Sequence, residues 1–407
     1  MRSKYAVILG GTKFQEPLID SISKYGVLPL VLDKNPSCYL ARKQIKFIEC
    51  DISSPEYCFQ KIKDYNIIGC FTAQSDIGVP SQGYINSELN LLGVDYKTAK
   101  VASNKYLFRR LMEENFVPQP KFFKCSDYKD VLNVVSNLNF PFVIKSVDSS
   151  GSRGITIVQQ LSEIKAAIDD AYKHSRESYF LCEQFISGVE YGAQTISING
   201  SLCNCFLHTD WTENNIPVGH CMPIDDSKEI TRKMNDVISK SIKALNLSGP
   251  SNVDLILDKD DNVFVLEIGA RIGATCLPEL VNLSTNVNLF DKQVAIAFGK
   301  YSLKENREVK FKKAGVRIIT SDKTFAFRKD QNQVINKFLI KLKKDFSLDH
   351  LNLDPYCNNV IRKLNSGIDR FGEIIIVNED MNISDIQQEL DIVNSLLIKF
   401  LYNMREI

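Results

Sequence analysis

The segment PFVIKSVDSSGSRGITIV, residues 141–158, combines a lysine with a long run of glycine and serine. Two apolar runs, residues 141–144 and 155–158, flank the polar stretch, which is a hairpin pattern with a turn longer than a hairpin needs. Glycine and serine let the chain approach a ligand closely, and successive free backbone amides bind anions. Lys145 adds a point charge at the base of this loop. The segment therefore predicts a phosphate site.

A second pattern places two carboxylates in neighbouring apolar strands. Residues 252–257 and 263–268 are apolar runs separated by a turn, which predicts an antiparallel hairpin. Asp254 and Glu267 can then lie close together on one face, and acids inside apolar strands are costly unless a cation pairs with them. Hard oxygen ligands suit Mg²⁺, which takes few carboxylates together with substrate phosphates. The alternative is a buried salt bridge, such as one between Glu267 and Arg271.

The segment EQFISGVE, residues 183–190, is a strand end that runs through a glycine to a second acid. Its backbone N–H and C=O groups can present hydrogen bonds to a planar heterocycle, and Glu190 can bind a sugar diol. Considered alone, an ordinary strand end with solvated acids is the better interpretation.

The elements that position these residues alternate between strand and helix over roughly the first 120 residues. Strands are expected at 5–9, 27–32, 47–50 and 67–72 with a helix at 17–25, which favours a parallel sheet whose ligand edge carries Gly10-Gly11 and residues 74–76. The GxGxxG motif of dinucleotide-binding folds is absent. Later strands are expected at 142–146, 154–158, 179–184, 192–198, 201–208, 252–257, 263–268, 316–320 and 373–377. Helices are expected at 97–115, 164–172, 228–245, 287–298 and 383–401.

Composition narrows the class of protein. The 407 residues are 44% hydrophobic and 24% charged, which is ordinary for a soluble globular protein, and the formal net charge of +1 favours neither nucleic acid nor a membrane as a partner. Eleven cysteines without paired CxxC spacing indicate free thiols in a reducing cytosol and argue against zinc. No apolar run has the length of a signal peptide or a membrane span. We therefore expect a cytoplasmic protein.

The order of these features resembles the ATP-grasp superfamily, of the carboxylate–amine ligase type with an organisation like that of carbamoyl phosphate synthase and biotin carboxylase. The resemblance spans roughly residues 5–320. It implies an α/β and α+β fold with a Rossmann-like parallel-sheet domain at 1–98. It also implies an ATP-grasp domain of two β-rich subdomains at 99–307, with a lid at about 120–187, and an α+β region at 308–407.

The resemblance implies a role for individual residues toward ATP. Lys105 and Lys145 would contact its phosphates. The lid loop over the phosphates would contain Ser150, Gly151, Ser152 and Gly154. The residues around adenine would be Glu183, Gln184, Phe185 and Ile186. Glu190 would hold the ribose, and Leu266 would pack on the adenine ring.

The resemblance also assigns the metal and the catalytic groups. Asp254 and Glu267 would bind Mg²⁺, with Mn²⁺ as a substitute, although Gly269 stands where the superfamily often has an asparagine. The catalytic candidates are Arg271 for the acyl phosphate or substrate carboxylate, Lys145, Arg317 on a strand lining the same site, and His220 facing substrate or assisting proton transfer.

Several of these assignments keep a structural alternative. A hydrogen-bonded structural histidine fits His220 equally well. Weaker candidates, expected on a preceding turn, are His208, Asp210 and Trp211. Ser75 and Asp76 could cap a helix or contact substrate, and capping is the better interpretation. Arg153 could touch the γ-phosphate from the lid, but a solvated side chain is the better interpretation.

The implied reaction is ATP-dependent joining of a small-molecule carboxylate to an amine through an acyl phosphate, with ADP and phosphate released. The resemblance suggests a homodimer. One alternative is a bicarbonate-using carboxylase or carbamoylating enzyme, which the departure from Glu-x-Asn-x-Arg at residues 267–271 disfavours. The other is an ATP-binding protein without catalysis, supported by Gly269 and opposed by the two lysines, the two acids and Arg271.

Overall fold

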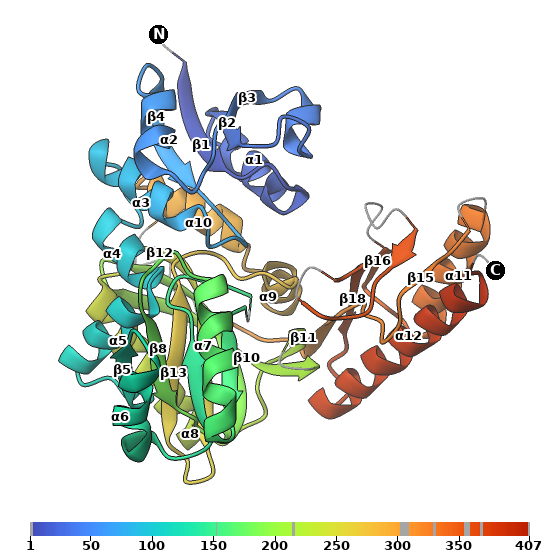
Figure 1. Ribbon diagram of the computed structural model, residues 1–407. Helices are drawn as coiled ribbons and strands as arrows, with labels where there is room; N and C mark the ends of the chain where they lie inside the picture. Colours follow the sequence, from blue (N-terminus) through green and yellow to red (C-terminus); the bar gives the residue numbers. More distant parts are fainter. Residues whose placement is uncertain are drawn as a thin grey trace. The chain divides into compact units, whose positions relative to one another are not determined.

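The computed structural model describes residues 3–151, 153–213, 216–301, 309–328, 331–353, 359–366 and 369–405, and the chain divides into two units (Figure 1). The first unit contains Met1–Cys205, Ser227–Ala274 and Asn288–Glu308, and the second contains Phe206–Asp226, Thr275–Val287 and Val309–Ile407. The chain leaves the first unit within strand β10 (Ser201–Glu213). Among the described helices, none combines the length and the apolar content that a membrane crossing requires.

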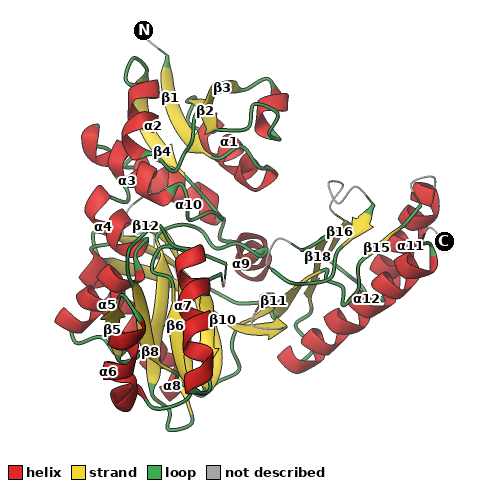
Figure 2. Ribbon diagram, in the orientation of Figure 1, coloured by secondary structure: helices red, strands yellow, loops and turns green. Residues whose placement is uncertain are grey.

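A parallel sheet in the order β3-β2-β1-β4 begins the first unit, as the sequence predicts (Figure 2). The apolar residues of β1, β2 and β4 are largely buried, as in parallel sheets covered on both faces. The elements of this part, in which η denotes a 3₁₀ helix, are β1 (Lys4–Leu9), η1 (Lys13–Gln15), α1 (Glu16–Ser23), β2 (Leu28–Asp33), η2 (Leu40–Lys43), β3 (Lys46–Glu49), α2 (Pro55–Ile62), β4 (Asn66–Phe71), α3 (Val79–Glu88) and, from later in the chain, α10 (Leu289–Ala297).

The loop after β4 is held by hydrogen bonds at Ala73 and Gln74. The Gln15 side chain accepts from the Ala73 N–H at 3.1 Å and donates to its carbonyl at 2.5 Å. The Gln74 N–H donates to the Ile272 carbonyl at 3.0 Å. These bonds fix the position of Asp76, which follows two residues later.

The single helix expected at 97–115 is wrong, because the chain breaks into α4 (Tyr96–Ala102) and α5 (Lys105–Glu114). Asn104 between them is extended, with φ −135°, and its Oδ1 accepts from the N–H groups of Tyr106 and Leu107 at 3.0 and 3.1 Å. This side chain caps the new helix and satisfies two of its free donors. The break puts Lys105 at the first position of α5.

An antiparallel sheet in the order β5-β8-β6-β7 follows, with helices α6 and α7 packed against it. The predicted hairpin is confirmed, since β6 pairs with β7 and Lys145 lies opposite Ile155. The elements are β5 (Phe122–Cys125), α6 (Tyr128–Leu138), β6 (Phe142–Lys145), β7 (Ile155–Val158), η3 (Leu161–Glu163), α7 (Ile164–Lys173) and β8 (Phe180–Gln184).

The remainder of the first unit carries the antiparallel strands β9 (Gly188–Ile198), β12 (Gly249–Asp258) and β13 (Val263–Gly269), with helix α8 (Lys228–Leu245). The predicted hairpin is again confirmed: β12 pairs with β13, and Asp254 lies directly opposite Glu267. In the same register Gln194, Asn252 and Gly269 lie side by side across the three strands. Directly paired residues project to the same face, so these two rows share one face of the strands.

In the second unit the end of β10 pairs with β11 (Ile216–Met222), and β11 continues into the order β14-β18-β16. The remaining elements of this unit are α9 (Leu277–Thr285), β14 (Ala314–Ile318), β15 (Phe325–Ala326), α11 (Asn332–Asp345), β16 (His350–Leu353), β17 (Val360–Ile361), β18 (Gly372–Val377) and α12 (Ile383–Asn403). Their core includes Ile374, Ile386 and Leu390. His208, Asp210 and Trp211 lie within β10 and not on a turn, which corrects the expectation from sequence.

Candidate active site

Lys145, at the end of β6, is buried beside an acid and an arginine. Its Nζ lies 2.7 Å from Glu183 Oε2 on the neighbouring strand β8. The Arg109 guanidinium donates to the same carboxylate, at 2.9 Å to Oε1 and 3.2 Å to Oε2. Burial by itself raises the pKa of Glu183, but the two cations bring that pKa below its ordinary value. Glu183 is therefore ionised and holds Lys145 in place.

Arg109 is fully buried and connects three elements. Besides Glu183, it donates to the carbonyls of Val265 and Leu266 at 3.4 and 2.9 Å. It thereby joins α5 to β8 and β13. Sequence reasoning missed this residue, although an arginine on the apolar face of an amphipathic helix was a signal that could have found it.

The same surroundings set the pKa of Lys145 to about 8. Burial is the largest cause and lowers the pKa, the Glu183 carboxylate raises it, and the positive charges of Arg109 and Lys105 lower it further. The ammonium group is therefore charged at neutral pH but is easier to deprotonate than an exposed lysine.

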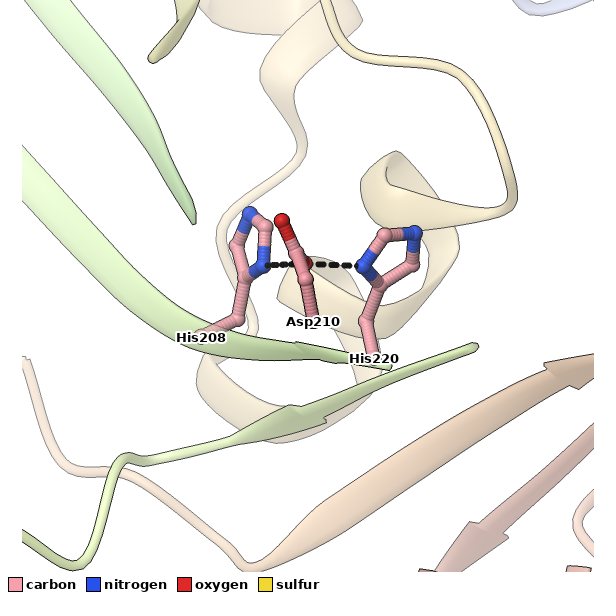
Figure 3. Close-up of side chains that lie close together, drawn as sticks. All are labelled: His208, Asp210 and His220. Atoms are coloured by element: carbon pink, nitrogen blue, oxygen red, sulfur yellow. Dashed lines mark hydrogen bonds and ion pairs between the residues drawn. The ribbon is translucent and has the colours of Figure 1, made fainter. Parts of the chain in front are cut away.

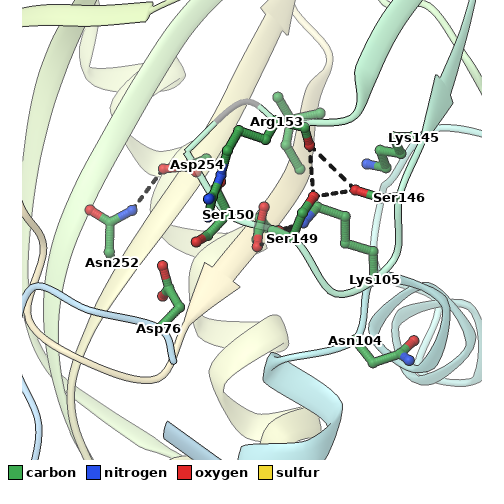
Figure 4. A network of polar contacts seen from close by, with 12 residues as sticks. Asp76, Asn104, Lys105, Lys145, Ser146, Ser149, Ser150, Arg153, Asn252 and Asp254 are labelled. Atoms are coloured by element: carbon green, nitrogen blue, oxygen red, sulfur yellow. Dashed lines mark hydrogen bonds and ion pairs between the residues drawn. The ribbon is translucent and has the colours of Figure 1, made fainter. Parts of the chain in front are cut away.

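Lys105 lies between the glycine- and serine-rich loop and the acid pair (Figure 4). Its Nζ donates to the Ser149 carbonyl at 2.6 Å and lies 3.4 Å from Glu267 Oε1. The side chain is buried, and the position is fixed because Lys105 begins α5 and its own N–H donates to the Val147 carbonyl at 2.7 Å. The two predicted phosphate lysines thus belong to the same unit.

The loop between β6 and β7 folds back on itself. The Ser146 N–H donates to the Gly154 carbonyl at 2.8 Å, the Ser149 hydroxyl donates to the Arg153 carbonyl at 2.7 Å, and the hydroxyls of Ser146 and Ser149 are hydrogen-bonded. Gly151 has φ +68° and nothing within 4 Å of where a Cβ would stand, so this point of the loop faces open space. The predicted loop residue Ser152 lies outside the described residues.

Arg153 is exposed, as expected, and its Nε donates to the Ser150 carbonyl at 3.0 Å. This bond uses one guanidinium N–H within the loop.

The acid pair is supported by a directional chain of amide hydrogen bonds. The Gly273 N–H donates to Gln194 Oε1 at 2.8 Å, and Gln194 Nε2 donates to Asn252 Oδ1 at 2.6 Å. Asn252 Nδ2 then donates to Asp254 Oδ1 at 2.8 Å. Because the first donor is a backbone N–H, the orientation of both amide side chains follows from it. No pattern in the sequence indicates this relay.

Arg271 pairs with Asp76 and not with Glu267, so the salt-bridge alternative from sequence is wrong. Its Nε and Nη2 donate to the two Asp76 oxygens at 2.8 and 3.1 Å. Asp76 therefore does not cap α3, whose N-cap position is Gly78. A Cβ at Gly269 would lie 3.3 Å from Arg271 Cζ and 3.4 Å from Asp76 Oδ1. The ion pair thus borders the space that a side chain at position 269 would need.

The residues predicted to hold the nucleoside are accessible, with one correction. Gln184, Phe185, Ile186 and Leu266 are half-buried, and Glu190 is exposed near the start of β9. The carboxylate of Glu183 is taken by Arg109 and Lys145, so it is not available to frame adenine.

His220 and Arg317 belong to the second unit and have polar partners there. The His220 Nδ1 lies 2.5 Å from Asp210 Oδ1, and its Nε2 lies 2.7 Å from the Thr275 hydroxyl. Arg317, buried on β14, pairs with Glu213 at 2.5 Å and with Asp391 at 3.1 Å. The structural alternative for His220 accordingly has two hydrogen bonds in its favour.

Asp254 and Glu267 offer the donor set that Mg²⁺ requires. Both are half-buried carboxylates, directly opposed across β12 and β13, with Asp254 oriented by Asn252 and Glu267 beside Lys105. Mg²⁺ is usually bound by one or two carboxylates together with water and phosphate oxygens, so the residues present fit the ion.

Comparison with known proteins agrees with this geometry. The family model for the ATP-grasp domain matches residues 102–275. Among curated proteins, the chain is 24% identical to an uncharacterized protein of Sinorhizobium fredii and 22% identical to the carbamoyl phosphate synthase large chain of Caldanaerobacter subterraneus, over 69% and 70% of its own length. It spans 61% and 27% of the lengths of these two relatives.

Solved structures show the same fold over nearly the whole chain. Phosphoribosylglycinamide synthetase from Anaerococcus prevotii is 24% identical with a TM-score of 0.75, covering 100% of this chain and 99% of that one. The L-amino acid ligase from Bacillus licheniformis is 18% identical with a TM-score of 0.74, covering 97% and 98%. The predicted fold class is thereby confirmed.

Proposed function

We propose that the chain is an ATP-dependent ligase that joins a small-molecule carboxylate to an amine through an acyl phosphate, because the family model for the ATP-grasp domain matches residues 102–275. The observation that carries this proposal is that Lys105, Lys145 and the Asp254–Glu267 pair belong to one unit, in which Lys105 Nζ lies 3.4 Å from Glu267 Oε1. Lys145 is held in the same unit by Glu183, 2.7 Å away. The family match, together with a solved relative named as an amino acid ligase, supports the same reaction class.

The two lysines would stabilise the negative charge of the phosphoryl group during its transfer. Negative charge gathers on the phosphoryl group during its transfer, so cations fixed beforehand lower the barrier. Glu183 and Arg109 hold Lys145, while the Ser149 carbonyl and Glu267 hold Lys105. The loop at 146–154 then covers the phosphates, which protects the acyl phosphate from water.

Asp254 and Glu267 would hold Mg²⁺, which supplies further positive charge to the phosphates. The relay through Gln194 and Asn252 keeps the Asp254 carboxylate turned in one direction. Gly269 adds no ligand, so oxygens from water and phosphate complete the coordination.

The reaction needs no covalent bond to the protein. A carboxylate oxygen attacks the γ-phosphorus as the bond to the bridging oxygen breaks and ADP leaves. The amine nitrogen then attacks the acyl carbon, phosphate leaves with the C–O bond electrons, and the nitrogen loses a proton. Arg271 has five N–H groups, of which Asp76 and the Ile272 carbonyl take three, so two remain for a substrate carboxylate or the acyl phosphate.

A second candidate is that bicarbonate serves as the carboxylate substrate. The similarity to carbamoyl phosphate synthase over 70% of this chain favours it. The protein chemistry at the lysines and the acid pair is the same in both cases.

The deciding experiment is phosphate release from ATP with Mg²⁺, measured across pools of amino acids and small carboxylates, with and without bicarbonate. Release that needs both a carboxylate and an amine supports the ligase, whereas release with bicarbonate alone moves the protein to the carboxylating branch. Lys145→Ala should abolish release, and Lys165→Ala, which changes an exposed lysine on α7, should not. ATP binding without release in any pool contradicts both.

A further inference from the structure

Two histidines and an aspartate form a cluster in the second unit that the proposed reaction does not use. The Nδ1 atoms of His208 and His220 lie 2.8 and 2.5 Å from the same oxygen, Asp210 Oδ1 (Figure 3). One potential ligand atom from each residue lies within 4.8 Å of the others. Both imidazoles are buried, with 1% and 3% exposure, and the Asp210 side chain is 14% exposed.

Strand geometry brings the three side chains together without help from a flexible loop. His208 and Asp210 are two residues apart in β10, so they project to the same face. Asp210 and His220 are directly paired across β10 and β11. The cluster is thus mounted on two hydrogen-bonded strands, which makes it a rigid platform.

The Asp210 carboxylate has no ion pair with a lysine or an arginine among the described residues. Within the described part of the chain, the ion pairs of Asp210 are with His208 and His220. The nearby Arg317 is bound to Glu213 and Asp391 instead. A buried carboxylate is costly unless a cation compensates it, and a metal ion held between Asp210 and the two imidazole nitrogens would supply that charge.

The outer contact of His220 also fits metal ligation at Nδ1. Histidine ligands usually donate their other ring N–H to an oxygen, which fixes the ring. His220 Nε2 lies 2.7 Å from Thr275 Oγ1, an oxygen suited to accept that proton. The Nε2 of His208 has no hydrogen-bond partner among the described residues, so only the ring of His220 has this outer contact.

We propose that His208, Asp210 and His220 bind a divalent transition-metal ion, with Zn²⁺ the best-suited ion, through two imidazole nitrogens and one carboxylate oxygen. Two histidines and a carboxylate with an open fourth position form a common zinc donor set. With His220 Nδ1 on the ion, its Nε2–H would donate a hydrogen bond to the Thr275 hydroxyl. The site is chemically distinct from the Asp254–Glu267 pair, whose oxygen donors suit Mg²⁺.

Zinc titration of the chelator-treated full chain by calorimetry, in excess Mg²⁺, tests the proposal. We expect a site for one Zn²⁺ in the wild type that is lost in Asp210→Asn and in His208→Ala. Thr275→Ala should weaken it about 10- to 100-fold, the usual effect of an outer contact. Asp254→Asn is the control, because it changes the acid pair of the first unit and should leave zinc affinity unchanged. Equal affinity in wild type and Asp210→Asn overturns the proposal.

A spectroscopic measurement on the wild type keeps the test independent of how the variants fold. Bound Cu²⁺ should show electron paramagnetic resonance couplings to two imidazole nitrogens, and bound Co²⁺ should lack thiolate charge-transfer bands. The thiolate control matters because the chain has eleven cysteines. Thiolate bands, or fewer than two nitrogen couplings, place the ion elsewhere and overturn the assignment.

Discussion

Asp76 and Arg271, 195 residues apart in the sequence, form a bidentate ion pair beside the Cα of Gly269. The pair joins the loop after β4 to the end of β13. It also borders the space beside Gly269, where a Cβ would lie 3.3 Å from Arg271 Cζ and 3.4 Å from Asp76 Oδ1.

Replacing Asp76 should therefore destabilise the first unit. Asp76→Asn removes the charge that compensates Arg271, whose side chain is 13% exposed, while the 34% exposure of Asp76 moderates the cost. We expect the free energy of unfolding to fall by about 1–3 kcal/mol, between the values for exposed and buried pairs. Urea denaturation measures the change. Unchanged stability in Asp76→Asn would show that the pair contributes nothing.

ATP affinity should depend on pH through Lys145. Its pKa of about 8 means that the free protein loses this charge as pH rises through 8, while bound phosphates favour the charged form. The dissociation constant for MgATP should therefore increase roughly tenfold from pH 7 to pH 9. Lys145→Arg, which stays charged over this range, is the control that separates this effect from titration of the nucleotide. A wild-type constant that stays flat over that range contradicts the assignment.

Removing the charge of Glu183, which pairs with Arg109 and Lys145, should lower the free energy of unfolding strongly. Glu183→Gln leaves Arg109, which is fully buried, and Lys145 without a compensating charge. Breaking one partner of a buried pair costs about 3–5 kcal/mol, and we expect a loss of that size in denaturant unfolding. Glu163→Gln, at a half-buried acid outside this pair, is the control and should change stability little. A loss below about 1 kcal/mol in Glu183→Gln would mean that water already screens this pair.

Local patterns in the sequence were enough to predict both hairpins that carry the site. Residues 142–158 and 252–268 show apolar runs around a turn, and Lys145, Asp254 and Glu267 lie on them as expected. The helix expected at 97–115 failed because the hydrophobic pattern continues through Asn104, whose side chain ends one helix and caps the next.

Contacts between distant segments could not be read in the same way. The partners of Arg271, Glu183 and Asn252 are 195, 74 and 58 residues away, so no spacing rule reveals them. Strands β5 and β11 and helices α6, α9 and α11 were also not predicted, since tertiary packing decides such elements as much as local propensity does.

Gly273 should be intolerant of any side chain because of the amide relay. A Cβ there would lie 2.5 Å from Gln194 Nε2 and 2.8 Å from Asn252 Oδ1, so Gly273→Ala must displace the Gln194 side chain. The relay then no longer turns Asn252 toward Asp254. We expect weaker Mn²⁺ binding at the acid pair, measured by electron paramagnetic resonance without nucleotide, and a lower free energy of unfolding.

A double variant separates the clash from other effects at this position. In Gln194→Ala the relay is already broken, so adding Gly273→Ala should cost less stability than it does in the wild type. This non-additivity is the mark of residues in contact. If the two losses simply add, Gly273 acts independently of Gln194, and the relay does not explain why the chain has glycine there.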